Sequence, residues 1–95
     1  MTPEKVKQVV EEMRGIARAR LGNNRPIALK SPYDDNPTTM DAMRHMLYMC
    51  DEVDKFVDAG RIEKAMRWLG FVQGALWQCG LVTIDDLKRM NMPND

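Results

Sequence analysis

The sequence predicts an all-α protein in which a long antiparallel αα-hairpin is joined to an N-terminal amphipathic helix and a short C-terminal helix. Three observations predict this class. Apolar residues recur at steps of three and four, hydroxyl residues followed by acids mark helix starts, and glycines stand where helices should end. Because 95 residues have room for one hydrophobic core, we expect a single domain over residues 1–95.

The first helix is expected over residues 3–21. Thr2 is a candidate cap, and Pro3 suits the first helical position. The apolar residues of this segment form one stripe: Val6, Val9, Val10, Met13, Ile16, Ala17 and Leu21. Residues 22–37 contain three prolines in sixteen positions, so a loop is predicted there.

Two long helices with a very short break between them are predicted next. The first covers residues 39–59 and begins after Thr38, a candidate hydroxyl cap. Gly60 supplies the left-handed residue that ends it, and the second helix runs over residues 61–79 until Gly80. So short a break makes the pair fold back as an antiparallel hairpin.

The last helix is expected over residues 84–90. Thr83 is a candidate cap, and Asp85 and Asp86 place two acids in the positive first turn. Alternation of the kind that marks strands is absent from the sequence.

Composition narrows the possible partners. The chain has 14 basic and 14 acidic residues, so electrostatic attraction to nucleic acid or to an anionic membrane is not its organising principle. Its apolar runs are far shorter than the ~20 residues of a membrane helix, and its start lacks a secretory hydrophobic segment. We therefore expect a cytoplasmic protein without membrane contact.

The charges are nevertheless unevenly placed. Residues 1–30 carry seven bases against three acids, whereas residues 31–60 carry two bases against seven acids. The basic end of the first helix is expected to dock beside the acidic ridge of the second, either within one chain or between copies. The ridge consists of Asp51, Asp54 and Asp58.

The hairpin has more apolar surface than one chain is expected to cover. On a helical wheel the apolar arc of residues 61–79 spans roughly two-thirds of the circumference, wider than the stripe of a typical surface helix. We therefore expect self-association, with nine candidate interface residues: Met46, Met49, Phe56, Trp68, Gly70, Phe71, Gln73, Gly74 and Trp77.

Two features within this arc need explanation. Gly70 and Gly74 each cost about 1 kcal/mol relative to alanine inside a helix. Either another helix approaches closely along them, or they form a groove for a ligand or peptide. Gln73, in the middle of the arc, is expected to face Leu47 and Tyr48 across the hairpin, where its amide would fix the register.

Candidate chemical groups are few. Cys50 and Cys79 are separated by about 13 Å along the hairpin axis, which predicts reduced, buried thiols rather than a disulfide or a metal pair. His45 falls on the polar side of its helix, between Asp41 and Glu52, and is expected to be solvated. No phosphate-binding glycine loop, zinc signature or paired-carboxylate motif is found. We therefore expect no catalytic residue, metal or cofactor, and no enzymatic activity.

The best candidate ligand site is the basic end of the first helix with the loop that follows. Guanidinium groups bind phosphate through two hydrogen bonds, and a tyrosine can stack on a base. The residues concerned are Arg14, Arg18, Arg20, Arg25, Lys30 and Tyr33. Basic residues at a helix C-terminus are also favoured by the helix dipole alone, so both interpretations stay open.

A longer pattern lies in the second half of the chain. The string RWLGFVQGALW, at residues 67–77, is followed by Gly80 and by the Thr-Ile-Asp-Asp-Leu segment at residues 83–87. Over residues 43–92 the chain resembles a group of small helical proteins encoded by tailed bacteriophages and prophages. The resemblance carries over no catalytic residue. It implies a small phage accessory protein that binds and inhibits or redirects a host component, for example one that acts in defence.

Three functional hypotheses follow. The first is a non-enzymatic, oligomeric interaction protein that assembles through the hairpin and binds a host protein in the host cytoplasm through its first helix and loop. The second is an oligomeric sponge that holds a nucleotide or another small phosphate-bearing ligand at the basic cluster. The third and weakest is a DNA-binding regulator, which would require salt-dependent binding to duplex DNA.

Overall fold

The computed structural model describes residues 1–29 and 38–93, and all regular secondary structure within them is helical. Four helices follow one another: α1 (Pro3–Leu21), α2 (Thr39–Asp58), α3 (Ile62–Gln78) and α4 (Ile84–Asn91). The all-α prediction is confirmed, and each helix begins and ends within one residue of its predicted bounds. The predicted loop at residues 22–37 is described only as far as residue 29, where it has no regular structure.

The helix ends have the caps that the sequence predicts. The hydroxyls of Thr2 and Thr38 each accept a hydrogen bond at 3.1 Å from a backbone N–H three residues later. Thr83 and Asp86 form a reciprocal capping box at the start of α4. Gly60 and Gly80 adopt φ angles of 75° and 78° after α2 and α3, a conformation that glycine adopts without strain.

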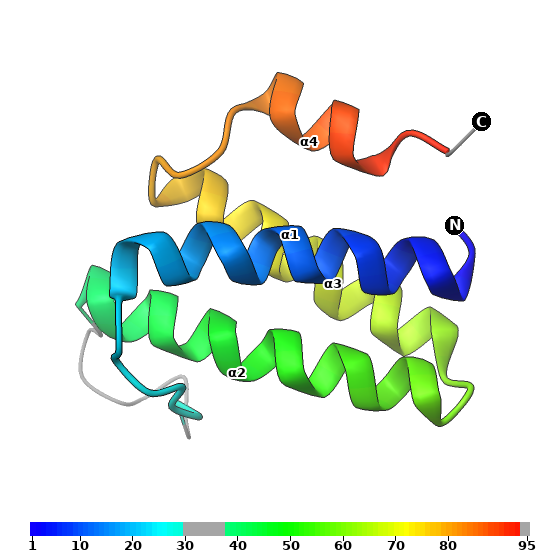
Figure 1. Cartoon of the computed structure of the whole chain (residues 1–95), viewed down its shortest axis with the longest axis horizontal. Helices are drawn as coiled ribbons and strands as arrows, with labels where there is room; N and C mark the ends of the chain where they lie inside the picture. The colour runs from blue at the N-terminus through cyan, green and yellow to red at the C-terminus, as the bar shows by residue number, and fades with distance from the viewer. Residues whose placement is uncertain (30–37, 94–95) are drawn as a thin grey trace.

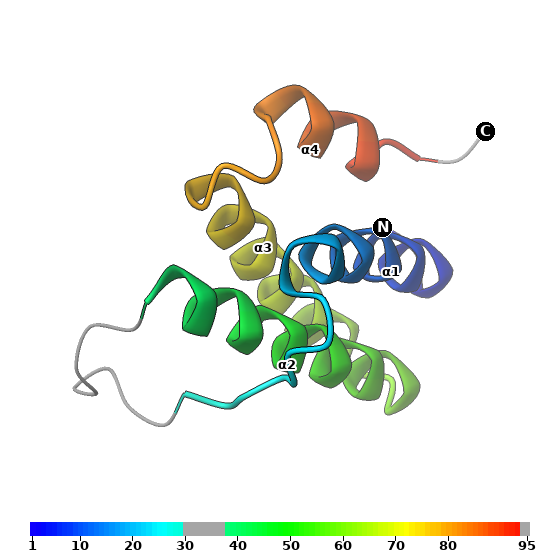
Figure 2. The same ribbon diagram turned by 60° about the vertical axis from the view of Figure 1, so that its left-hand side comes forward.

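The first three helices form most of one core, to which α4 adds Met90. α1 and α2 lie side by side, and α3 turns back after Gly60, crosses behind α1 in the view of Figure 1 and contacts both helices (Figures 1 and 2). α4 lies above α3 and α1 in the view of Figure 1. The buried apolar residues are Val6, Val9, Val10, Met13, Ala17, Leu21, Met43, Met46, Leu47, Met49, Cys50, Val53, Ala65, Leu69, Val72, Leu76, Val82 and Met90.

Two of the predicted interface residues belong to this core. Met46 is 3% exposed and Met49 is 6% exposed, so neither offers surface to another molecule. The sequence-based expectation for these two methionines is wrong because α1 covers one side of α2 and α3 covers another, which leaves a narrower free face than the wheel suggested.

The acidic ridge of α2 is neutralised within the chain. Lys7 pairs with Asp58, and the Arg14 guanidinium donates to Asp54 at 2.7 Å and to Asp51 at 3.2 Å. Burial by itself would lower the pKa of Arg14, but its hydrogen bond to Asp54 and the charge of that carboxylate outweigh burial and raise it. The predicted docking of basic α1 on acidic α2 is therefore confirmed.

α4 is joined to α3 by a pair of amides. Gln73 Nε2 donates to Asn91 Oδ1 at 2.7 Å, and Asn91 Nδ2 donates back to Gln73 Oε1 at 3.2 Å. Gln73 therefore does not face Leu47 and Tyr48 as predicted. That prediction treated the pair of helices as parallel rods, whereas α4 folds back over the flank of α3 that carries Gln73 (Figure 1).

Candidate functional site

Of the six residues predicted as a ligand site, the structure describes four: Arg14, Arg18, Arg20 and Arg25. Lys30 and Tyr33 lie outside the part of the chain that the structure describes. Arg20 is exposed on α1, and the backbone carbonyl of Arg25 accepts a hydrogen bond at 2.7 Å from Arg44 Nε.

The two remaining arginines of that cluster are held by contacts within the chain. Arg14 is occupied by the carboxylates of α2. Arg18 Nη1 donates to the backbone carbonyls of Gly22 at 3.1 Å and Asn24 at 2.6 Å, and so satisfies acceptors at the C-terminal end of α1. Arg18 thus meets carbonyls at the C-terminal end of α1, as the dipole interpretation predicts, whereas Arg14 binds the carboxylates of α2.

His45 holds the segment that follows α1. Its Nδ1 accepts a hydrogen bond at 3.0 Å from the backbone N–H of Leu29, and its ring stacks on Tyr48 with 5.5 Å between centroids. Nearby, the Ile27 N–H donates to the Arg44 carbonyl at 3.2 Å. The prediction of a solvated histidine is wrong, because the segment after α1 folds back along α2 and half-buries the ring.

The two cysteines are free, as predicted, but they differ in their surroundings. Cys50 is buried, and burial raises the pKa of its thiol to about 12, although the charge of Arg14 opposes this shift. Cys79 is half-buried rather than fully buried. No group of three or more residues suited to holding a metal ion occurs within residues 1–29 and 38–93.

This difference predicts selective thiol chemistry. At pH 8 a thiol of pKa about 12 is about 10⁻⁴ ionised, and the thiolate is the reactive form, so Cys50 should not react with an aromatic disulfide reagent in the folded protein. Cys79 should account for the single thiol that reacts. The Cys79→Ser variant should therefore show no reaction until denaturant is added, whereas Cys50→Ser should behave like the native chain. Rapid reaction of the folded Cys79→Ser variant would contradict the assignment.

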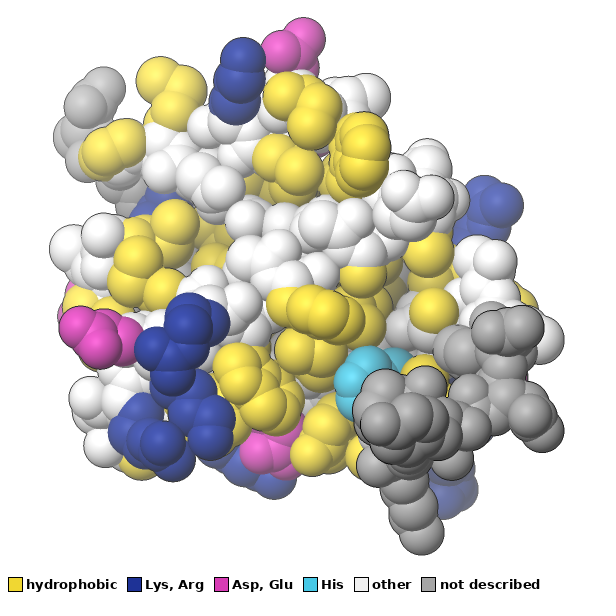
Figure 3. Space-filling model, turned by 180° about the vertical axis from the view of Figure 1, so that it is seen from behind, with side chains coloured by type: hydrophobic (Ala, Val, Ile, Leu, Met, Phe, Trp, Pro, Cys, Tyr) yellow, Lys and Arg dark blue, Asp and Glu magenta, His cyan; other side chains and the backbone are white. Residues whose placement is uncertain are grey.

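The outward side of α3 carries large apolar side chains that the chain itself does not cover. Phe71 is 60% exposed, Trp77 is 47% exposed and Met66 is 40% exposed. Between Phe71 and Trp77 on the helical wheel lie Gly70 and Gly74, which are exposed too, with the polar residues Glu63, Arg67 and Gln78 interspersed among them. We call Met66, Gly70, Phe71, Gly74 and Trp77 the α3 face. Figure 3 shows the molecule from behind, the side on which α3 lies, and hydrophobic side chains gather there in several patches.

The two glycines of the α3 face open onto empty space. A Cβ atom built at Gly70 or Gly74 would meet no atom within 4 Å. Of the two explanations left open for these glycines, close approach of α2 is therefore wrong, whereas another molecule has room to approach. Gly15 on α1 is equally open, so it provides a matched reference position.

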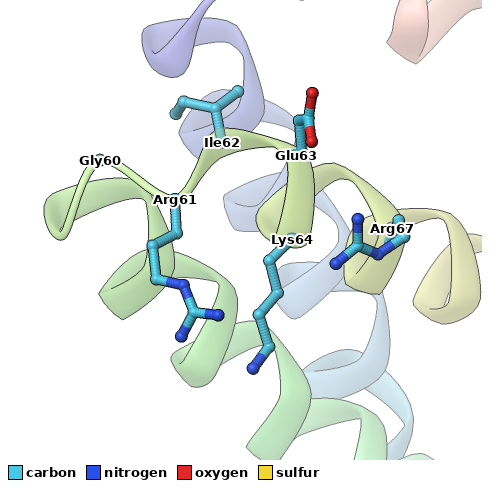
Figure 4. Close-up of a pocket in the computed structure, with 6 residues that line it drawn as sticks. All are labelled: Gly60, Arg61, Ile62, Glu63, Lys64 and Arg67. Atoms are coloured by element: carbon cyan, nitrogen blue, oxygen red, sulfur yellow. The ribbon is translucent and has the colours of Figure 1, made fainter.

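A basic end adjoins the α3 face. Arg61, Lys64 and Arg67 line a shallow pocket of about 380 Å³ at the start of α3 (Figure 4). The Lys64 ammonium lies 4.6 Å from the Phe56 ring centroid, and Phe56 packs edge-on against Trp68 at 4.9 Å. Phe56 and Trp68 were both predicted as interface residues. In the structure both rings are half-buried, and the Lys64 ammonium lies over them.

Sequence reasoning missed the basic end as a surface feature. Its signal is the regular spacing of three residues between Arg61, Lys64 and Arg67, which aligns side chains along one side of a helix. The excess of bases in residues 1–30 drew attention to α1 instead, where the charges are largely paired.

Comparison of the chain with protein-family models, with curated proteins and with solved structures finds no match. The resemblance to phage-encoded proteins therefore stays a prediction that depends on the residues quoted for it. Within the described ranges, no helix is long and apolar enough to cross a lipid bilayer.

Proposed function

We propose that this chain is a non-enzymatic binding protein that docks on another protein through the α3 face. The observation that supports this proposal is the exposure of Phe71 and Trp77, 60% and 47%, on one side of a helix whose other side completes the core. Isolated exposed apolar residues are ordinary, but aromatic residues gathered on one face are typical of protein interfaces.

The other chemical groups of the chain support a binding role in a different way. Cys50 is buried with a raised thiol pKa, so its nucleophilic form is suppressed. His45 accepts a backbone hydrogen bond, and Gln73 is paired with Asn91. Each of these side chains therefore serves the fold, whereas the α3 face serves nothing within the chain.

The biological setting of this binding is part of the same proposal. The resemblance over residues 43–92 points to phage accessory proteins, and residues 67–77, which carry its most specific string, include most of the α3 face. We therefore place the protein in the cytoplasm of an infected cell, where it inhibits or redirects a host component.

A charge placed on the α3 face tests the proposal. Phe71→Glu should abolish capture of a host protein from bacterial lysate, because it buries an unpaired carboxylate at the docking site. Met92→Glu, at a 63% exposed position beyond α4, should leave capture unchanged. Binding of the purified host protein, measured by calorimetry, should weaken at least 10-fold for Phe71→Glu alone.

Circular dichroism of both variants serves as the control for folding. Equal host binding by native chain and Phe71→Glu would contradict the proposal, and so would a native chain that binds neither a host protein nor itself.

A further inference from the structure

We infer that the protein covering the α3 face is a second copy of this chain, whose α3 packs antiparallel on the first about a two-fold axis at the level of Val72. The inference rests on the proposed function in taking the α3 face as a docking surface, and it names the occupant of that face in the free protein: a second copy of the chain, which a host protein would have to displace.

Shape is the first support. When two copies of one helix cross antiparallel at the level of residue 72, positions equally far before and after it lie opposite each other. Gly70 then meets Gly74 of the second copy, and Arg67 meets Trp77. Because neither glycine has a neighbour within 4 Å, two backbones can approach closely there. Each Arg67 guanidinium would reach an indole ring, which is a favourable cation–π pair.

Charge is the second support, and it also determines the direction. The start of α3 is basic, with Arg61, Lys64 and Arg67 against one acid, Glu63. The chain beyond the other end of α3 enters the acidic first turn of α4, where Asp85 and Asp86 stand. An antiparallel pair places each basic end near the partner's acidic end, whereas a parallel pair would bring six cations together. With a formal net charge of zero, two copies do not repel each other overall.

Area is the third support. An aromatic side chain has about 150–250 Å² to bury, so Phe71 and Trp77 together offer roughly 200 Å². Adding the exposed part of Met66 gives roughly 250–300 Å² of apolar surface per copy. A standard interface buries about 800 Å² per partner, of which a little over half is apolar. The face therefore supplies more than half of the apolar area that a standard dimer needs.

Cysteine cross-linking tests the arrangement directly. In a Cys79→Ser background, Gly70→Cys and Gly74→Cys are purified separately, mixed and mildly oxidised. The antiparallel pair predicts a disulfide between the two variants when mixed, and little cross-linking of either alone, because a disulfide needs Cα atoms about 4.4–6.8 Å apart. Gly15→Cys, at an equally open helical glycine, is the matched control and should cross-link at least 10-fold less. Efficient cross-linking of each variant with itself would overturn the antiparallel arrangement.

The mass in solution tests whether a second copy is the occupant. Light scattering of the native chain should show twice 10.9 kDa at tens of micromolar. Phe71→Glu and Gly74→Leu should each shift the protein to monomer without lowering its melting temperature at low concentration, since a side chain added at Gly74 meets open space in the single copy. Gly15→Leu should stay dimeric.

A native chain that is monomeric up to several hundred micromolar overturns this inference. It does not by itself overturn the proposed function, which fails if Phe71→Glu binds a host protein as well as the native chain does, or if the monomeric native chain binds no host protein either.

Discussion

Replacing Leu69 by alanine should lower the free energy of unfolding by about 3–5 kcal/mol. Leu69 is 2% exposed and lies on the side of α3 that packs against the other helices, so its truncation removes apolar contacts and leaves a cavity. Because a domain of this size is stable by only about 5–15 kcal/mol, the variant should be close to unfolding. Urea denaturation followed by circular dichroism measures the change.

Two methionines provide the matched comparison. Met13 is 0% exposed and Met92 is 63% exposed, so Met13→Ala should cost about 2–5 kcal/mol and Met92→Ala less than about 0.5 kcal/mol. All three substitutions should be measured in the Phe71→Glu background, where association does not add to stability. A loss below about 1 kcal/mol for Leu69→Ala would mean that α3 packs differently.

Arg14→Met should destabilise the fold by about 1–2 kcal/mol. The Arg14 side chain lies among the carboxylates of Glu11, Asp51 and Asp54, and removing it leaves like charges facing one another without their shared donor. The expected loss of stability is smaller than for a fully buried ion pair, because the Asp51 side chain is 52% exposed and water screens its charge.

Arg20, on the same helix, is the control. It is exposed, so Arg20→Met should change the stability by less than about 0.5 kcal/mol. Arg14→Lys keeps the charge but loses the forked geometry and should fall between the two. If Arg14→Met and Arg20→Met are equally stable, the Arg14 guanidinium is not needed by the fold and the anion-binding hypothesis regains support.

The helices and their ends were predictable because their determinants are local. A hydroxyl at Thr2, Thr38 or Thr83 caps the next few N–H groups, and Gly60 and Gly80 adopt the left-handed conformation that ends a helix. The path of α4 was not predictable in this way. It depends on how helices pack in space, so the partnership of Gln73 with Asn91 had no signal in the spacing of either residue.

The candidate site was also predictable only where its determinants are local to one helix. The width of the apolar arc pointed to Phe71 and Trp77, because exposure follows from how many sides of a helix are apolar. The arginines of α1 misled because their role depends on distant partners: Arg14 pairs with acids 37 and 40 residues further along the chain. A count of charges by segment detects the excess of bases in residues 1–30. It does not reveal that acids of α2 pair with some of these bases in the folded chain.

The pair of amides between Gln73 and Asn91 also limits which side of α3 can bind another molecule. Gln73 is 8% exposed, and Asn91 at the end of α4 supplies the hydrogen-bond partner that its amide needs. The flank of α3 that carries Gln73 is therefore occupied within the chain. The outward side of the same helix, with Phe71 and Trp77, is the side left free to contact another molecule.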